Sequence, residues 1–190
     1  MLKRASDVLL AALVVMVLWP VMVACALAVM MTSPGGALFR QERVGRGGRP
    51  FTILKFRSMR ADAPATGPHF TAAGDPRITR VGAFLRRTSL DELPQVLNVL
   101  NGDMSLVGPR PNVFRQRDEY TQADWDARNA VRPGITGLAQ ATLRSAATQE
   151  QRTALDLEYA RDRGEVARFF CDLRIFWLTA RIVVSGRGGN

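Results

Sequence analysis

Hydrophobic residues are concentrated at the two ends of this chain, and the longest apolar run lies near the front. Val8 to Met31 reads VLLAALVVMVLWPVMVACALAVMM and carries no charge. As a helix these 24 residues would span about 36 Å, more than the roughly 30 Å of a bilayer's hydrocarbon core. Because the run is too long for a signal peptide and no small-residue cleavage site follows it, the pattern predicts a membrane-embedded helix.

Two features bear on how that helix meets a membrane. Pro20 falls in the middle of the run, where it removes a backbone hydrogen bond and bends the helix. Both flanks are basic, with Lys3 and Arg4 before the run and four arginines after it, which are Arg40, Arg43, Arg46 and Arg49. Cytoplasmic flanks collect Lys and Arg, which favours a re-entrant helix that returns to the side it left. A proline-kinked single span stays equally open.

Behind the apolar run the pattern changes to short alternating segments. Ala37 to Val44 and Phe51 to Met59 are β-prone, and the glycine-rich residues 45–48 join them, which predicts a β-hairpin. The alternation places Lys55 and Arg57 on one face of the second arm.

The middle of the chain predicts a loop followed by helices. Residues 61–76 are rich in Ala, Gly and Pro, which is typical of a loop. A basic helix is expected over Ile78 to Arg87, and a second helix begins near Ser89 or Asp91. Residues 113–130 are charged at helical spacing and indicate a solvated face.

A second segment with the composition of a membrane-binding helix lies towards the C-terminus. Residues 131–140 are interrupted by Gly and Pro, which favours a loop. The segment Glu165 to Val184 interleaves aromatic and basic side chains, namely Phe169, Phe170, Phe176 and Trp177 with Arg168, Arg174 and Arg181. Such a helix suits the headgroup boundary of a membrane, although packing against the domain explains its apolar residues as well.

Charge adds a class of partner. Lys and Arg total 26 against 17 Asp and Glu, a formal net charge of +9 in 190 residues. This favours one domain with phosphate-bearing partners such as nucleic acid, nucleotide or anionic lipid. Cys25 and Cys171 lack metal-binding spacing and are expected to be small buried hydrophobes. His69 is the only histidine, which excludes a histidine-based triad and a histidine metal cluster.

An acid pair, Asp91-Glu92, stands out in this basic chain. Ser89 and Glu92 have the spacing of a capping box, and Asp91 alone is a second candidate for the N-cap. Acidic residues at a helix start are common and contribute well under about 2 kcal/mol. A structural role is therefore enough to account for the pair taken by itself.

The surroundings of the pair favour phosphate chemistry. Arg86 and Arg87 precede it and Arg110 follows in the stiff tripeptide 109–111, and guanidinium groups match phosphate oxygens. An aspartate held ionised among arginines is expected to have a lowered pKa and can attack phosphorus as a nucleophile. The neighbouring Glu92 can hold Mg²⁺, which combines one or two carboxylates with substrate phosphates. These residues indicate phosphoryl transfer at a membrane surface.

In order and spacing these motifs resemble the bacterial sugar transferase family, the monotopic polyisoprenyl-phosphate phosphoglycosyl transferases. The matching segments cover nearly the whole chain and are KRASD (3–7), LFRQERVGRGGRPFTILKFRSMR (38–60), DPRITRVGAFLRRTSLDELPQVLNVLNGDMSLVGPRP (75–111), RPGITGLAQ (132–140), LDLEYARD (155–162) and DLRIFWLTARIVV (172–184). The resemblance implies a minimal catalytic-domain form without the additional N-terminal membrane helices of some relatives.

The resemblance implies a two-step reaction on a UDP-sugar, the first membrane step of bacterial glycoconjugate or exopolysaccharide synthesis. Asp91 would attack the β-phosphorus, release UMP and hold the sugar phosphate until undecaprenyl phosphate takes it over. Glu92 would bind Mg²⁺ or activate the lipid phosphate. The implied substrate-binding residues are Lys55, Arg57, Arg86, Arg110 and Arg144. The sugar and the pathway stay open.

The resemblance also implies a fold and a location. It predicts an α+β, mainly helical chain with a re-entrant membrane helix broken at Pro20, a small β-hairpin and amphipathic interfacial helices. Residues 1–36 would be membrane-embedded, and residues 37–190 would form a cytoplasmic catalytic domain on the membrane surface. Together they would act as one functional unit at the cytoplasmic face of the bacterial inner membrane.

Some positions depart from the family pattern or allow a simpler explanation. Trp19 stands where relatives often have Ser before the proline, and ATLRSA follows Gln140 in place of a VNGRN-like run. Asp172 matches an acidic family position, and Arg168, one turn earlier, offers it a local ion pair.

Two other functions stay open on sequence alone. One is a membrane-tethered basic protein that binds nucleic acid or anionic lipid without catalysis. The other is an ordinary glycosyl transferase that passes on the sugar and releases UDP. Base stacking needs aromatic side chains among the basic residues, and Phe84 is the only one near residues 86–110. The expected partners are therefore a UDP-sugar, undecaprenyl phosphate and the membrane, without nucleic acid and with a homodimer left open.

Overall fold

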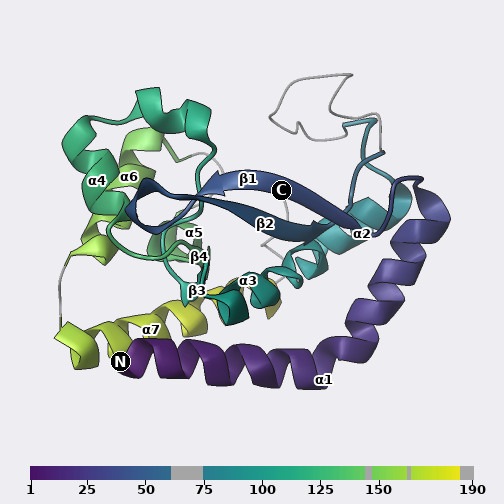
Figure 1. Ribbon diagram of the computed structural model, residues 1–190, viewed down its shortest axis with the longest axis horizontal. Coiled ribbons are helices and arrows are strands. Elements are labelled where there is room, and N and C mark those ends of the chain that lie inside the picture. Colours follow the sequence, from purple (N-terminus) through teal and green to yellow (C-terminus); the bar gives the residue numbers. More distant parts are fainter. Residues whose placement is uncertain (61–74, 144–146, 162–163, 185–190) are drawn as a thin grey trace.

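The computed structural model describes residues 1–60, 75–143, 147–161 and 164–184. Its α-helices are α1 (Leu2–Thr32), α2 (Arg80–Arg87), α3 (Gln95–Asn101), α4 (Gln122–Asn129), α5 (Leu138–Thr142), α6 (Gln149–Ala160) and α7 (Gly164–Val184). Short 3₁₀ helices are η1 (Arg46–Gly48), η3 (Leu90–Glu92) and η4 (Phe114–Glu119). The strands are β1 (Leu38–Val44), β2 (Pro50–Phe56), β3 (Ser105–Val107) and β4 (Gly134–Thr136). The predicted α+β, mainly helical fold is confirmed (Figure 1).

Three sequence predictions fall outside the described residues. They are nearly all of the expected loop 61–76, the histidine His69 within it, and the candidate phosphate ligand Arg144.

The predicted β-hairpin is confirmed. Strands β1 and β2 pair antiparallel from Leu38 opposite Phe56 to Val44 opposite Pro50, and η1 closes the turn. Two side chains of β2 anchor the hairpin in separate apolar clusters. Ile53 packs in the cluster of Ala11, Val99, Met104 and Leu106, whereas Phe56 packs in the cluster of Cys25, Val29 and Leu85.

Helix α1 is bent, and both of its ends contact the rest of the protein (Figure 1). Pro20 is the proline inside this helix, and sharp helix bends occur at prolines. At the first end, Arg4 donates hydrogen bonds to the carbonyls of Val99 and Leu100 at 2.7 and 3.1 Å. At the second end, Val29 is buried in the cluster under the hairpin. The domain therefore holds the helix on both sides of the bend.

A polar network fixes the first turns of α1. Asp7 is buried and accepts hydrogen bonds from the Ser105 hydroxyl at 2.8 Å and the Leu106 amide at 3.1 Å. Lys3 lies 2.6 Å from the Asp172 carboxylate, and the Tyr159 hydroxyl donates to the other oxygen of that carboxylate at 2.8 Å. The suggested pairing of Asp172 with Arg168 is therefore wrong.

Arg168 is occupied elsewhere. It donates a hydrogen bond to the Arg161 carbonyl and lies over the Tyr159 ring. The buried Asp172 needs a partner that burial also shields from water, and Lys3 supplies it across the chain.

Residues 131–140 are not the expected loop. They form β4, which pairs parallel with β3, and the start of α5. The backbones approach so closely that a Cβ added to Gly134 would lie 2.1 Å from the Gly108 amide nitrogen, and one added to Gly137 would lie 2.2 Å from the Gly108 carbonyl oxygen. These glycines permit a contact between distant segments, whereas local pattern suggested only turns.

The charged segment 113–130 is only partly a solvated face. Trp125 and Arg128 are buried on α4, and the Arg128 guanidinium lies 2.7 Å from the Asp156 carboxylate on α6. The spacing of charges along one helix does not reveal this ion pair, because the partner of Arg128 comes from another helix.

Helix α7 shows both expected faces. Ile175 is fully buried and Phe176 packs beside it, so one face belongs to the core. The other face exposes a stripe of apolar side chains at helical spacing, which are Val166, Phe170, Leu173 and Trp177. The helix is thus amphipathic, with its exposed side available to an apolar surface.

Candidate active site

The acid pair lies in the 3₁₀ helix η3 and caps no helix. Ser89 has a left-handed backbone (φ 57°), and its side chain makes no capping hydrogen bond. Both the capping-box prediction and the N-cap role suggested for Asp91 are therefore wrong. Leu90 and Leu93 anchor η3 in the apolar cluster under the hairpin. The two leucines of LDEL lie three residues apart and so share one side of the 3₁₀ helix, which leaves the two carboxylates outside that cluster.

Glu92 is held between two cations. Its Oε1 atom accepts hydrogen bonds from Lys55 Nζ at 2.7 Å and from Arg110 Nη2 at 3.0 Å. Burial alone would raise the pKa of Glu92, but the charges and hydrogen bonds of Arg110 and Lys55 outweigh it and lower the pKa to about 2. The Glu92 carboxylate is therefore fixed and ionised at neutral pH.

Asp91 differs from its neighbour. Within the part of the chain that the structure describes, no hydrogen bond or ion pair holds its carboxylate. Burial and the adjacent Glu92 charge raise the pKa of Asp91, although Lys55, Arg86 and Arg110 act in the opposite direction. The lowered pKa expected from the sequence is therefore wrong, because desolvation and the like charge outweigh the arginines. An unbound, more basic carboxylate is the better nucleophile of the two.

The other predicted ligands divide into two groups. Arg86 lies near enough to act on the charge of Asp91, and its Nε atom donates to the Ser58 hydroxyl at 2.8 Å. Arg57 instead donates to the Gly35 carbonyl at 2.6 Å, at the turn between α1 and β1. The structure thus brings Lys55, Arg86 and Arg110 to the acid pair and leaves Arg57 at a backbone turn.

Arg128 holds the loop that carries Arg110 in place. Arg128 donates a hydrogen bond to the Arg110 carbonyl at 2.6 Å while it pairs with Asp156. The Arg128 and Asp156 side chains are 3% and 7% exposed. Sequence reasoning missed this support, since nothing local links residue 128 to the loop.

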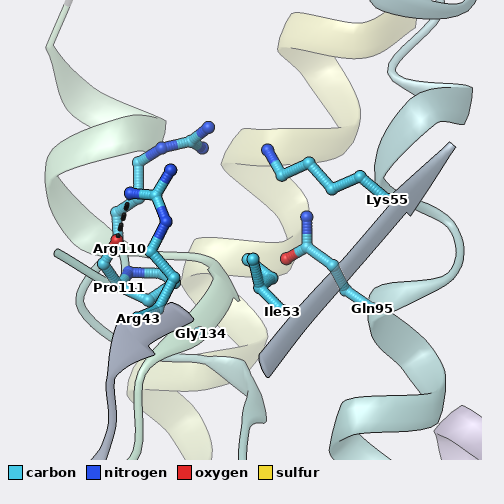
Figure 2. A pocket seen from close by; sticks show the side chains of 7 residues that line it. All are labelled: Arg43, Ile53, Lys55, Gln95, Arg110, Pro111 and Gly134. Atoms are coloured by element: carbon cyan, nitrogen blue, oxygen red, sulfur yellow. Dashed lines mark hydrogen bonds between the residues drawn. The ribbon is translucent and has the colours of Figure 1, made fainter. Parts of the chain in front are cut away.

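A pocket opens beside the acid pair, and Figure 2 shows the seven residues that line it. Arg43 and Arg110 occupy one side, and Lys55 extends towards them from the other. Ile53 and the buried Gln95 complete its inner part. Arg43 and Gln95 were not predicted as site residues. The hairpin register could have indicated Arg43, because it stands opposite Phe51, which shares a strand face with Ile53 and Lys55.

Glu92 is the residue that would hold a magnesium ion here, with substrate phosphates as the main further ligands. Among the described residues, no group of three or more His, Cys, Asp or Glu side chains is placed to hold a metal. The two hydrogen bonds to Glu92 use Oε1, which leaves Oε2 free for a cation. Mg²⁺ keeps several waters and needs only one or two carboxylates when substrate phosphates supply further oxygens.

The structure thus sets two acids among cations on an α+β domain that carries a long apolar helix, and this site suits phosphorylated substrates. The chain belongs to the bacterial sugar transferase family, whose model matches residues 1–186. The resemblance inferred from the motifs is thereby confirmed.

Several curated proteins are similar to this chain, including the following three. A UDP-glucose:undecaprenyl-phosphate glucose-1-phosphate transferase of Escherichia coli (strain K12) is 44% identical over 186 residues, 94% of this chain and 39% of the relative. The protein of the same name from Caulobacter vibrioides is 48% identical over 166 residues, 83% of this chain and 61% of the relative. A UDP-N-acetylgalactosamine-undecaprenyl-phosphate N-acetylgalactosaminephosphotransferase of Aeromonas hydrophila is 40% identical over 196 residues, covering 100% of this chain and 45% of the relative. The chain thus spans between about two fifths and three fifths of these relatives.

Proposed function

We propose that this protein transfers a sugar 1-phosphate from a UDP-sugar to undecaprenyl phosphate and releases UMP. The names of the relatives support the donor and acceptor classes. The observation that carries the chemistry is the contrast within the acid pair. Glu92 is ionised and held by Lys55 and Arg110, whereas none of the described residues binds the neighbouring Asp91 carboxylate.

In the first step, a carboxylate oxygen of Asp91 attacks the phosphorus that bears the sugar. The new oxygen–phosphorus bond replaces the bond to the bridging oxygen, and the electron pair leaves with UMP. In the second step, an oxygen of undecaprenyl phosphate attacks the same phosphorus, and the bond to Asp91 breaks. The products are undecaprenyl diphospho-sugar and the free Asp91 carboxylate, so no net proton transfer is needed.

The cations around the pair suit this reaction. Lys55, Arg86 and Arg110 provide positive charge near Asp91, where charge builds up on the phosphoryl oxygens. Glu92 orients the Lys55 and Arg110 side chains, and its second oxygen is the one we assign to Mg²⁺. When bound, the ion would neutralise charge on the diphosphate.

We also propose that α1 is a re-entrant helix. It enters the inner membrane from the cytoplasmic face, bends, and returns to the same face. A straight helix of 31 residues would separate its ends by about 46 Å. Yet Arg4 and Val29, near opposite ends, both contact the domain. A single domain cannot hold both ends if they lie on opposite sides of a bilayer. Among the described residues, α1 is the one helix long and apolar enough to cross a membrane, and it is mostly exposed.

Product analysis tests the reaction. Purified protein with Mg²⁺, undecaprenyl phosphate and a panel of UDP-sugars should release UMP. Asp91→Asn should abolish both turnover and the trapped sugar phosphate, whereas Asp118→Asn, an exposed matched control, should behave as wild type. Release of UDP would show an ordinary glycosyl transferase. Absence of turnover with every sugar would favour a membrane-tethered binding protein instead.

Cysteine labelling tests the topology. In a background with Cys25→Ala and Cys171→Ala, cysteines placed at Leu2 and Arg40 should both react with an impermeant reagent only from the cytoplasmic side. Labelling of the Leu2 position from the periplasm would establish a full span.

A further inference from the structure

The pocket beside the acid pair carries unmatched positive charge. Arg43, Lys55 and Arg110 line it, and the ionised carboxylate in contact with two of them is Glu92. Three cations against one carboxylate leave a formal charge of +2 around a space of about 230 Å³, open mouth included. Because the space is small and partly open, it suits one charged group of a substrate and not a whole enclosed ligand.

Two side chains of the pocket have polar groups without a partner among the described residues. Arg43 donates to the Pro111 carbonyl at 3.2 Å and to Gln41 at 2.6 Å, but its buried Nε has no acceptor among the described residues. Gln95 is 2% exposed, and no described residue forms a hydrogen bond with its side-chain amide. A buried guanidinium N–H without an acceptor costs free energy, which a bound anion would recover.

The pocket shares neighbours with the nucleophile Asp91, although Asp91 does not line it. The charges that act on Asp91 include Lys55, Arg86 and Arg110, whereas those that act on Arg43 are Arg110, Glu92 and Arg115. Glu92 and Arg110 act on both, so the pocket lies next to the acid pair. Burial, followed by the Arg110 charge, lowers the pKa of Arg43 to about 10. A bound anion would relieve this repulsion.

We propose that this pocket binds the phosphate group that leaves with the nucleoside, through the Arg43 guanidinium and the Gln95 amide N–H. The assignment to the leaving phosphate rests on the proposed function, in which Asp91 attacks the other phosphorus. Arg43 and Gln95 are thus substrate-binding residues that contact UMP as it forms. The acceptor's phosphate has the same chemistry, and the experiment separates the two sources.

Isothermal titration of the full-length protein in detergent tests the pocket with UMP and with inorganic pyrophosphate. Arg43→Gln should weaken UMP binding about 10- to 100-fold, the loss expected for a hydrogen bond between charged groups. Gln95→Glu keeps the shape of the side chain but replaces the amide with a negative carboxylate, which repels phosphate. It should weaken UMP binding at least as much as Arg43→Gln. Arg40→Gln, an exposed control on the same strand with the same change in charge, should stay within about twofold of wild type.

The outcomes distinguish this proposal from the proposed function. UMP affinity unchanged in Arg43→Gln and Gln95→Glu would overturn the pocket assignment. Loss of affinity for undecaprenyl phosphate micelles with UMP binding retained would assign the pocket to the acceptor and overturn it too. Arg43-dependent pyrophosphate binding without any UMP release from UDP-sugars would refute the proposed function while the anion site stands.

A second variant and a stability measurement separate a loss of binding from a loss of folding. Because Arg43 also binds the Pro111 carbonyl, the melting temperature of each variant is measured. Arg43→Lys keeps one donor and the charge but loses the planar fork, and it should lose part of the UMP affinity at an unchanged melting temperature. Full affinity in Arg43→Lys would refute a role for the fork.

Discussion

Removal of one charge from the buried pair under the Arg110 loop should destabilise the protein strongly. In Asp156→Asn, the Arg128 guanidinium would stay buried without a counter-charge, since the two side chains are 7% and 3% exposed. Breaking a buried pair on one side typically costs about 3–5 kcal/mol. At roughly 2–4 °C per kcal/mol for a chain of this size, the melting temperature should fall by about 6–20 °C.

Replacement of both partners should give a different result. Burial raises the pKa of Asp156 in spite of the Arg128 charge, so desolvation outweighs the attraction within the pair. An apolar pair, Arg128→Met with Asp156→Leu, should therefore recover most of the stability that either single change loses. The remaining deficit is the Arg110 carbonyl, which loses its donor at a cost of about 1–3 kcal/mol.

Stability and activity should then separate. Chemical unfolding followed by the fluorescence of the buried Trp125, on the same helix as Arg128, measures stability. UMP release measures activity, and the double variant should stay impaired because the Arg110 loop has lost its support. Asp126→Asn, exposed on α4, is the control and should change stability by less than about 0.5 kcal/mol. An unchanged melting temperature in Asp156→Asn, or full turnover in the double variant, would refute this reasoning.

Three further predictions concern the acid pair and its support. The pKa of Glu92 falls from 4.5 to about 2 on folding, so its charge should contribute about 3 kcal/mol above pH 5. This contribution is lost as pH falls towards 2, and denaturant titrations at several pH values should show a smaller loss in Glu92→Gln. The raised pKa of Asp91 places the acidic limb of the pH–rate profile above pH 3.8. Glu92→Gln should move that limb to lower pH, and an unmoved limb would assign it to another group. Gly82→Ala should reduce stability and weaken the Ser58–Arg86 bond, because the new Cβ would lie 1.9 Å from the Ser58 carbonyl oxygen; a melting temperature equal to wild type would contradict this.

Sequence pattern alone predicted those elements that depend only on interactions within one segment. The apolar run, the hairpin and the basic helix before the acid pair follow from spacing and turn residues within one segment. The pair itself and the cations Lys55 and Arg110 were identified by motif, and the structure brings them together.

What sequence reasoning missed depends on contacts between distant segments. Strand β4 needs the Gly108 backbone against Gly134, and Arg128 needs Asp156 from another helix. The pKa of Asp91 depends on how much water the fold removes, which charge counting along the chain does not reveal.

Contacts between distant segments also connect the apolar helix α1 to the elements that carry the active site. The acid pair rests on η3, whose leucines pack against the second half of α1 around Val29. The strand that leads into the Arg110 loop is held by the first half of α1, through Asp7 and the Leu106 amide. The hydrogen bond between Glu92 and Arg110 therefore joins two parts that lie on opposite sides of the bend. Both halves of α1 therefore help to position the site, because one half packs against the 3₁₀ helix of the acid pair and the other holds the strand that leads to Arg110.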